Sequence, residues 1–174
     1  SLGGMAGITL ADRAPDRVVG IALIDVAHKL EAEGVRKIVD FIAAQGIMVH
    51  GAFMLGFPTE TEEEMRATID WAASSSFHTA AFFRVIPFKG TELFTQVEHA
   101  GFSLPTDWSA YEPYETDINR STVPEKMIFR LRKQAYQRFY WNPARMFRIF
   151  KLIPNKATMI PFLTLGMVAP PPDP

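Results

Sequence analysis

The chain has 174 residues, of which 48% are apolar and 21% charged, and a formal net charge of −1. This length suits one domain with a hydrophobic core, and the composition excludes a disordered or fibrous protein. The absence of cysteine excludes a disulfide framework, a cysteine nucleophile, a cysteine-ligated zinc and an iron–sulfur cluster held by the chain itself.

Membrane spans and secretory signals are not evident in the sequence. The longest strongly apolar stretch extends from Met159 to Ala169, is interrupted by Pro161, and is shorter than the ~20 residues that a spanning helix needs. The first residues also lack a basic segment followed by an apolar one. We therefore expect a cytoplasmic protein.

Two helices are predicted before the first strand. The first extends from about Arg17 to His28, with apolar residues at Val18, Ile21, Ala22, Ile24 and Val26. The second extends from Glu31 to Gln45, where apolar residues recur at the spacing of an amphipathic helix. Gly46 follows it and is a favourable residue at a helix C-terminus.

Strands and helices alternate in the middle of the chain. Ile47 to Phe57 is apolar nearly throughout, which indicates a strand buried on both faces, as in a parallel sheet or barrel. A capping box at Thr61–Glu64 predicts a helix that extends to about Ala73. Thr79 to Ile86 is a second apolar strand, and a short helix follows from about Glu92 to Ala100. A strand–helix–strand unit of this kind predicts an α/β fold with parallel strands.

The C-terminal part is predicted to be helical. Residues 102–122 form an irregular connection, after which Pro124 opens a helix whose apolar stripe comprises Met127, Leu131, Ala135 and Phe139. Another helix begins at Asn142–Pro143, and we expect the proline-rich residues 169–174 to form a disordered tail.

Charge is unevenly distributed along the chain. Acidic residues predominate from Phe57 to Asp117, and basic residues predominate from Glu125 to Lys156. Two interpretations remain open: these parts form surfaces for partners, or they face each other within one fold.

The most informative motif extends from His50 to Glu63 (HGAFMLGFPTETEE). A buried strand leads into a glycine, a proline and a capped helix, so the chain turns at the carboxyl end of the strand, where α/β barrels bind ligands. Gly56 would allow close approach of the backbone to a ligand. This segment closely resembles the fifth strand and following helix of radical S-adenosylmethionine (radical SAM) enzymes.

The resemblance continues in register from about Leu23 to Phe150. Leu23 to Gly46 resembles the preceding helix–loop–helix, and Arg84 to Phe94 (RVIPFKGTELF) resembles the sixth strand and its turn. Phe139 to Phe147 (FYWNPARMF) is similar to the helical extension of the branch associated with a cobalamin-binding domain. The resemblance implies the last βα units of a partial TIM-like barrel in residues 1–101, a connection in 102–122, and a helical C-terminal extension in 123–168.

Two motifs of the family are absent from this chain. These are the three cysteines that hold the [4Fe–4S] cluster and the glycine–glycine–acid segment that binds the methionine amine. The resemblance therefore implies the C-terminal portion of an iron–sulfur oxidoreductase or methyltransferase that uses S-adenosylmethionine, with cobalamin as a further candidate cofactor. None of these groups is expected to bind strongly to this chain alone. The alternative is a non-catalytic fragment or partner subunit that completes another chain's barrel.

The resemblance also implies candidate site residues on the adenosyl side of the cofactor. They are the residues that match the ends of the fifth and sixth strands, namely Phe53, Leu55, Gly56, Val85, Ile86 and Pro87. Ordinary packing in the barrel is the alternative role for Phe53 and Val85. His50 and Arg84 are candidate substrate contacts. His50 either lines the mouth of the barrel or forms a hydrogen bond in the core. Arg84 is a charged side chain inside an apolar strand and needs a partner or an opening to water, so it either contacts an anion or carboxylate or points to the surface.

Other polar groups indicate no further catalytic site. The four histidines, at positions 28, 50, 78 and 99, lack the spacing of a metal site, and we predict none. Glu60 and Glu62–Glu64 are interpreted as a helix cap and a solvated first turn. A phosphate-binding domain built on this helix start is the weakest alternative, because four glutamates would repel a phosphate.

The predicted partners follow from surface chemistry. The basic aromatic segment 129–151 packs on its own domain or contacts an anionic membrane or lipid, and nucleic acid is the less favoured partner. A barrel cut before its fifth strand would leave Ile47 to Phe57 with an unpaired edge. We therefore expect either a homo-oligomer or association with a cysteine-bearing N-terminal portion.

Overall fold

A computed structural model of the chain describes residues 13–14, 16, 20–23, 32–101, 104, 107 and 121–154. It is a mixed α/β structure in which β1 (Gly20–Leu23), β2 (Met48–Leu55) and β3 (Thr79–Arg84) form a parallel sheet in the order β1-β2-β3. The helices are α2 (Ala32–Ala44), α3 (Glu62–Ser74), α4 (Glu92–His99), α5 (Glu125–Tyr140) and α6 (Pro143–Leu152). None of the helices in these ranges is both long enough and apolar enough to span a membrane.

The first predicted element is wrong. The helix expected from Arg17 to His28 is interrupted by β1, which pairs with β2 from Gly20 opposite Met48 to Leu23 opposite Gly51. A strand of four residues is stabilised by hydrogen bonds to a neighbouring strand. A short apolar run in the sequence does not indicate which segment that neighbour is. The other predicted strands and helices are confirmed within a few residues at their ends.

The pairing of β1 also corrects the expectation that Ile47 to Phe57 has an unpaired edge. β2 is the central strand, with β1 on one side and β3 on the other. The homo-oligomer that we predicted from that edge stays a prediction without this support.

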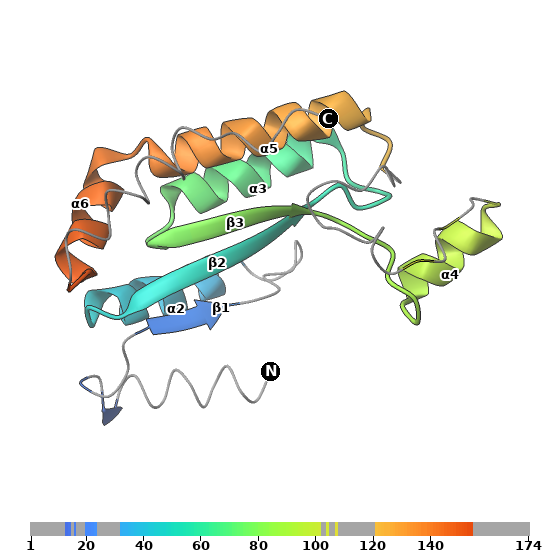
Figure 1. The fold of residues 1–174 in the computed structure, drawn as a ribbon. Coiled ribbons are helices and arrows are strands. Elements are labelled where there is room, and N and C mark those ends of the chain that lie inside the picture. The colour runs from blue at the N-terminus through green and yellow to red at the C-terminus, as the bar shows by residue number, and fades with distance from the viewer. Residues whose placement is uncertain are drawn as a thin grey trace.

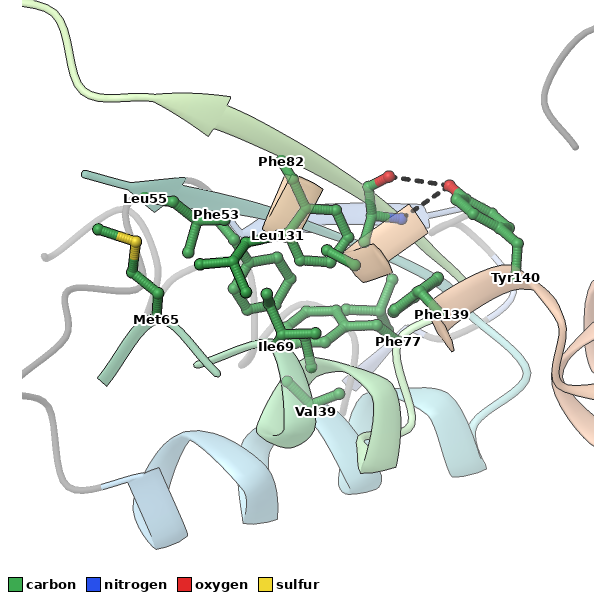
Figure 2. Packing of buried hydrophobic residues seen from close by; sticks show 14 of the residues in the cluster. Val39, Phe53, Leu55, Met65, Ile69, Phe77, Phe82, Leu131, Phe139 and Tyr140 are labelled. Atoms are coloured by element: carbon green, nitrogen blue, oxygen red, sulfur yellow. Dashed lines mark hydrogen bonds between the residues drawn. The ribbon is translucent and has the colours of Figure 1, made fainter. Parts of the chain in front are cut away.

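Within the described residues, the helices α2, α3 and α5 contribute to one core on one face of the sheet (Figure 1). Figure 2 shows this core, in which Phe53 stacks on Phe82 with ring centroids 5.2 Å apart and meets Phe77 edge to face at 5.6 Å. Each helix supplies apolar residues at helical spacing, including Val39 and Ile42 from α2, Met65 and Ile69 from α3, and Leu131 and Phe139 from α5. The part of the chain that the structure describes is therefore a sheet with a helical layer on one side.

The predicted capping box at the start of α3 is present. Thr61 Oγ1 accepts a hydrogen bond from the Glu64 N–H at 3.2 Å, and the Glu64 carboxylate accepts one from the Thr61 N–H at 2.8 Å. These bonds satisfy N–H groups that the first turn of a helix leaves without partners. They fix the point at which the chain leaves the carboxyl end of β2 and enters α3.

The helix α5 covers the outer edge of β3. The Tyr140 hydroxyl accepts from the Ala80 N–H at 3.0 Å and donates to the Ala80 carbonyl at 2.9 Å (Figure 2). The Tyr136 hydroxyl accepts from the Phe82 N–H at 3.1 Å. Side chains thus replace the backbone partners of a further strand at this edge. The boundary between barrel-like region and helical extension stays a prediction, and α5 shares the core of the sheet.

An ion pair and a side-chain hydrogen bond join α3 to α5. Arg138 forms an ion pair with Asp70, and the Arg66 guanidinium donates to the Gln134 side chain at 3.4 Å. These elements come from the acidic and the basic parts of the chain, respectively. For α3 and α5, the interpretation that the two parts face each other within one fold is confirmed.

The fully buried Arg145 connects the start of α6 to other elements through hydrogen bonds. Its guanidinium donates to carbonyl oxygens at the end of α3, before β3 and at the end of α5, namely those of Ala72, Ala73, Ser75, Phe77 and Phe139. Burial lowers the pKa of Arg145 to about 10, with the charge of Arg148 adding to the effect. A cation at the C-terminus of α3 also complements the negative end of the helix dipole.

Candidate functional site at the open face of the sheet

The second face of the sheet carries half-buried and exposed side chains. We call it the open face and define it by Met48, His50, Ala52 and Met54 of β2 and Thr79, Ala81 and Phe83 of β3. These residues alternate along each strand with the buried ones, as the pleat requires. In the described part of the chain, the helices that pack on the sheet lie on its other face. A ligand at the sheet would therefore meet the open face.

His50 is the titratable group of the open face on β2. Its Nδ1 lies 2.8 Å from Thr79 Oγ1, and the two residues are register partners on neighbouring strands. Burial lowers the pKa of His50, so the neutral imidazole predominates at pH 7. A neutral imidazole held by a hydroxyl can position a polar group or accept a proton. His50 thus lies half-buried on the open face, and its role as a substrate contact stays a prediction.

The carboxyl end of β2 is closed by a buried glutamate. Gly56 adopts a positive φ of 94°, and the N–H groups of Gly56 and Phe57 donate to Glu60 Oε2 at 2.7 and 3.1 Å. The side chain of Glu60 is only 1% exposed, so our interpretation of it as part of a solvated first turn is wrong. Because Glu60 already binds these N–H groups, they are not open to an anion, which argues further against a phosphate site here.

The six predicted cofactor contacts occupy two positions. The side chains of Phe53 and Leu55 lie in the core beneath the helices, so these residues could reach a ligand on the open face only through their backbone. Gly56 follows at the strand end. Val85, Ile86 and Pro87 are buried after β3, where the Val85 N–H donates to the Leu55 carbonyl at 3.0 Å. Their role as cofactor contacts stays a prediction.

Arg84 lies on the opposite face from His50. It pairs in register with Leu55, and its Nη1 donates to Glu125 Oε1 of α5 at 2.6 Å. Its guanidinium also lies over the ring of Phe129, 4.7 Å from the centroid. The carboxylate partner that a buried cation needs is thus supplied by the chain itself. The structure does not bring the two predicted substrate contacts together.

The sequence reasoning missed the small and apolar residues of the open face. Ala52 and Ala81 are register partners there, with Met54 and Phe83 next along the strands. The signal that could have found them is parity, because residues two positions apart on a strand share a face with one another. Taking His50 as a ligand contact selects Ala52 and Met54, and it excludes the side chain of Phe53.

Metal-binding groups are absent from the described ranges, where no three His, Asp or Glu side chains gather. His78, which immediately precedes β3, has a structural role. Its buried Nδ1 accepts a hydrogen bond from the Val49 N–H at 3.1 Å. Burial, together with the charges of Arg148 and Arg145, lowers the pKa of His78 to about 4.

The chain is similar to two curated proteins that are named methyltransferases. An uncharacterized methyltransferase of Pyrococcus horikoshii is 31% identical over 98 residues, which are 56% of this chain and 21% of that protein. Cytidylyl-2-hydroxyethylphosphonate methyltransferase of Streptomyces wedmorensis is 32% identical over 88 residues, which are 47% of this chain and 16% of that protein. The matched part spans about a fifth or less of the length of these relatives. No protein-family profile matches the chain.

Proposed function

We propose that this chain forms the last parallel βα units of the barrel of a radical SAM methyltransferase and lines one side of its adenosyl site. The observation that carries the proposal is a parallel sheet with its helices on one face and an open face that ends beside Gly56 and Val85. Such a face lines the interior of α/β barrels, whose ligands bind at the carboxyl ends of the strands. The names of both relatives support methyl transfer. The resemblance of HGAFMLGFPTETEE supports the radical SAM family.

An iron–sulfur cluster does not fit the residues of this chain. Such clusters are held by cysteine thiolates, and the sequence contains no cysteine. The cluster of the proposed enzyme would have to be held by a different stretch of polypeptide. This requirement agrees with the length of the relatives, each of which extends far beyond the matched part.

The adenosyl part of S-adenosylmethionine fits the open face. Ala52 and Ala81 are register partners with short side chains, and in this proposal a flat base lies against the sheet at this pair. Met54, which is 39% exposed, and Phe83 add apolar surface beside them. In this proposal the neutral His50 hydrogen-bonds a hydroxyl of the ligand or substrate. Sites of this kind combine apolar walls with a few placed polar groups.

A second candidate function places the rest of the barrel in another polypeptide. β1 pairs with β2 along one edge, and no strand of the described residues pairs with its other edge. Backbone groups at such an edge can bind a further parallel strand. The chain would then be a partner subunit that completes the barrel and supplies the open face without catalytic residues of its own.

The test is reductive cleavage of S-adenosylmethionine by a cysteine-bearing polypeptide joined to this chain or mixed with it. We expect Ala52→Trp, which fills the open face, to lower cleavage at least about tenfold, since misplacing reacting groups by about 1 Å can cost a hundredfold. Ala67→Trp, on the exposed side of α3, is the matched control and should leave cleavage unchanged. Equal activity of the two variants, with equal unfolding midpoints, would contradict the proposed adenosyl wall. Activity only in the joined protein favours the first function, and activity in the mixture favours the second.

A further inference from the structure

Three exposed aromatic side chains belong to α6 and to the turn before it. Trp141, in the turn before the helix, is 70% exposed, Phe147 is 58% exposed and Phe150 is 44% exposed. We call these residues, with Arg148 and Lys151, the α6 surface. The opposite side of α6 carries the buried Arg145 and Ile149. The helix therefore has one buried face, and Phe147 and Phe150 lie exposed on another side.

Cations accompany these rings. The Lys151 ammonium lies 4.7 Å from the centroid of the Phe147 ring, and Arg148 is half-buried one position after Phe147. From Lys126 to Pro154 the sequence contains no acidic residue. Of the nearby arginines, Arg145 is engaged with backbone carbonyls and Arg138 with Asp70. The charge that the α6 surface presents to a partner is therefore positive.

The position of α6 separates it from the open face. Arg145 binds the carbonyls of Ser75 and Phe77, which immediately precede β3, so α6 lies at the amino-terminal end of this strand. Figure 1 shows α6 and α4 at opposite ends of the sheet. A partner bound at α6 would leave the carboxyl ends of the strands accessible.

We propose that the α6 surface binds the interface of an anionic lipid bilayer. Phe147, Phe150 and Lys151 are three and four residues apart, so they share one side of the helix. Aromatic rings with an adjacent lysine are the composition that inserts at the level of lipid headgroups, the rings among the upper acyl chains and the ammonium at the phosphates. Tryptophan favours the same depth. The positive charge of the surface complements anionic lipid.

A lipid bilayer accounts for this surface better than nucleic acid does. Affinity for nucleic acid comes mainly from many lysine and arginine contacts with phosphates. The α6 surface offers one exposed cation, Lys151, and the half-buried Arg148 beside three large aromatic rings, which favours burial of apolar area with a smaller electrostatic contribution. In this arrangement the membrane holds the protein by the amino-terminal end of its sheet, and the open face stays available to its own ligands.

The experiment measures binding of the full chain to vesicles of phosphatidylcholine with phosphatidylserine and to vesicles of phosphatidylcholine alone. We expect binding to the anionic vesicles that weakens with salt. Lys151→Glu should weaken it at least about fivefold, the effect of one basic residue near an anionic surface. Phe147→Ser combined with Lys151→Glu should abolish it. The matched control is Phe88→Ser with Lys89→Glu, an exposed phenylalanine and lysine after β3, which should bind as the parent does.

A second readout locates the contact at the helix itself. Phospholipid brominated in its acyl chains should quench tryptophan fluorescence on binding, and Trp141→Phe should remove most of this quenching. The proposal is wrong if the chain binds neither vesicle, or if the α6 and control variants bind alike. It is also wrong if single-stranded RNA binds through Phe147 and Lys151 while vesicles do not. Self-association that is lost in the α6 variant, without vesicle binding, would assign the surface to a second copy instead.

Discussion

Replacing Arg145 tests whether one buried guanidinium joins α3, β3 and α5 to α6. In Arg145→Met the side chain stays long, but the carbonyls around it lose their donor. Three of these hydrogen bonds have N···O distances of 2.9 Å. Bonds that involve a charged group contribute about 1.5–3 kcal/mol each before the cost of burying the cation is subtracted. Taking half of their sum for that cost, we expect the variant to lose about 3 kcal/mol of its free energy of unfolding.

The assay is equilibrium unfolding in urea, followed by circular dichroism. Arg138→Met is the matched control, because it removes a more exposed arginine whose ion pair with Asp70 should contribute about 0–1 kcal/mol. Arg145→Lys keeps a cation with fewer donors and should fall between the parent and Arg145→Met. The reasoning is refuted if Arg145→Met unfolds at the same urea concentration as Arg138→Met.

Two further predictions concern the core. The pKa of His78 is about 4 in the folded chain and 6.5 in the unfolded chain, so the unfolded chain takes up the proton first as the pH falls. The free energy of unfolding should therefore decrease by up to about 3 kcal/mol as the pH drops from 6.5 to 4. His78→Asn, which keeps an acceptor for the Val49 N–H, should flatten that part of a stability–pH curve, and an unchanged slope would contradict this role. A Cβ on Gly51 would lie 2.8 Å from the Phe53 ring, so Gly51→Ala should lower stability by about 1–3 kcal/mol in urea unfolding. Gly34→Ala in α2, where no atom lies within 4 Å, should instead raise it by about 0.5–1 kcal/mol, and equal signs for the two would count against this packing argument.

Local signals in the sequence were sufficient for most elements. The capping box at Thr61 located the start of α3, and the apolar stripe of Leu131 and Phe139 indicated the buried side of α5. β1 was missed because a strand of four residues has too few positions to show a period, and its pairing with β2 lies far along the chain. In so short a segment, the apolar residues fit the spacing of a helix as well as that of a strand.

The candidate site was less accessible to sequence reasoning. β2 is apolar at nearly every position, so its hydropathy did not indicate that Phe53 faces the helices while His50 faces the open side. Arg84 and Arg145 are charged residues whose burial depends on acceptors that the fold brings from other elements. Such partners are separated in sequence by dozens of residues, and composition alone gives no means of pairing them.

The hydroxyls of two α5 tyrosines, which bind the edge of β3, determine where a further strand can join this sheet. Since Tyr140 and Tyr136 occupy the backbone groups of Ala80 and Phe82, a strand can join the described sheet only beside β1. If two copies paired through β1, neither sheet would have an edge left to which a third copy could bind. If copies of the described sheet associated edge to edge, the association would therefore stop at a pair, whereas a sheet with two open edges would polymerise into a filament.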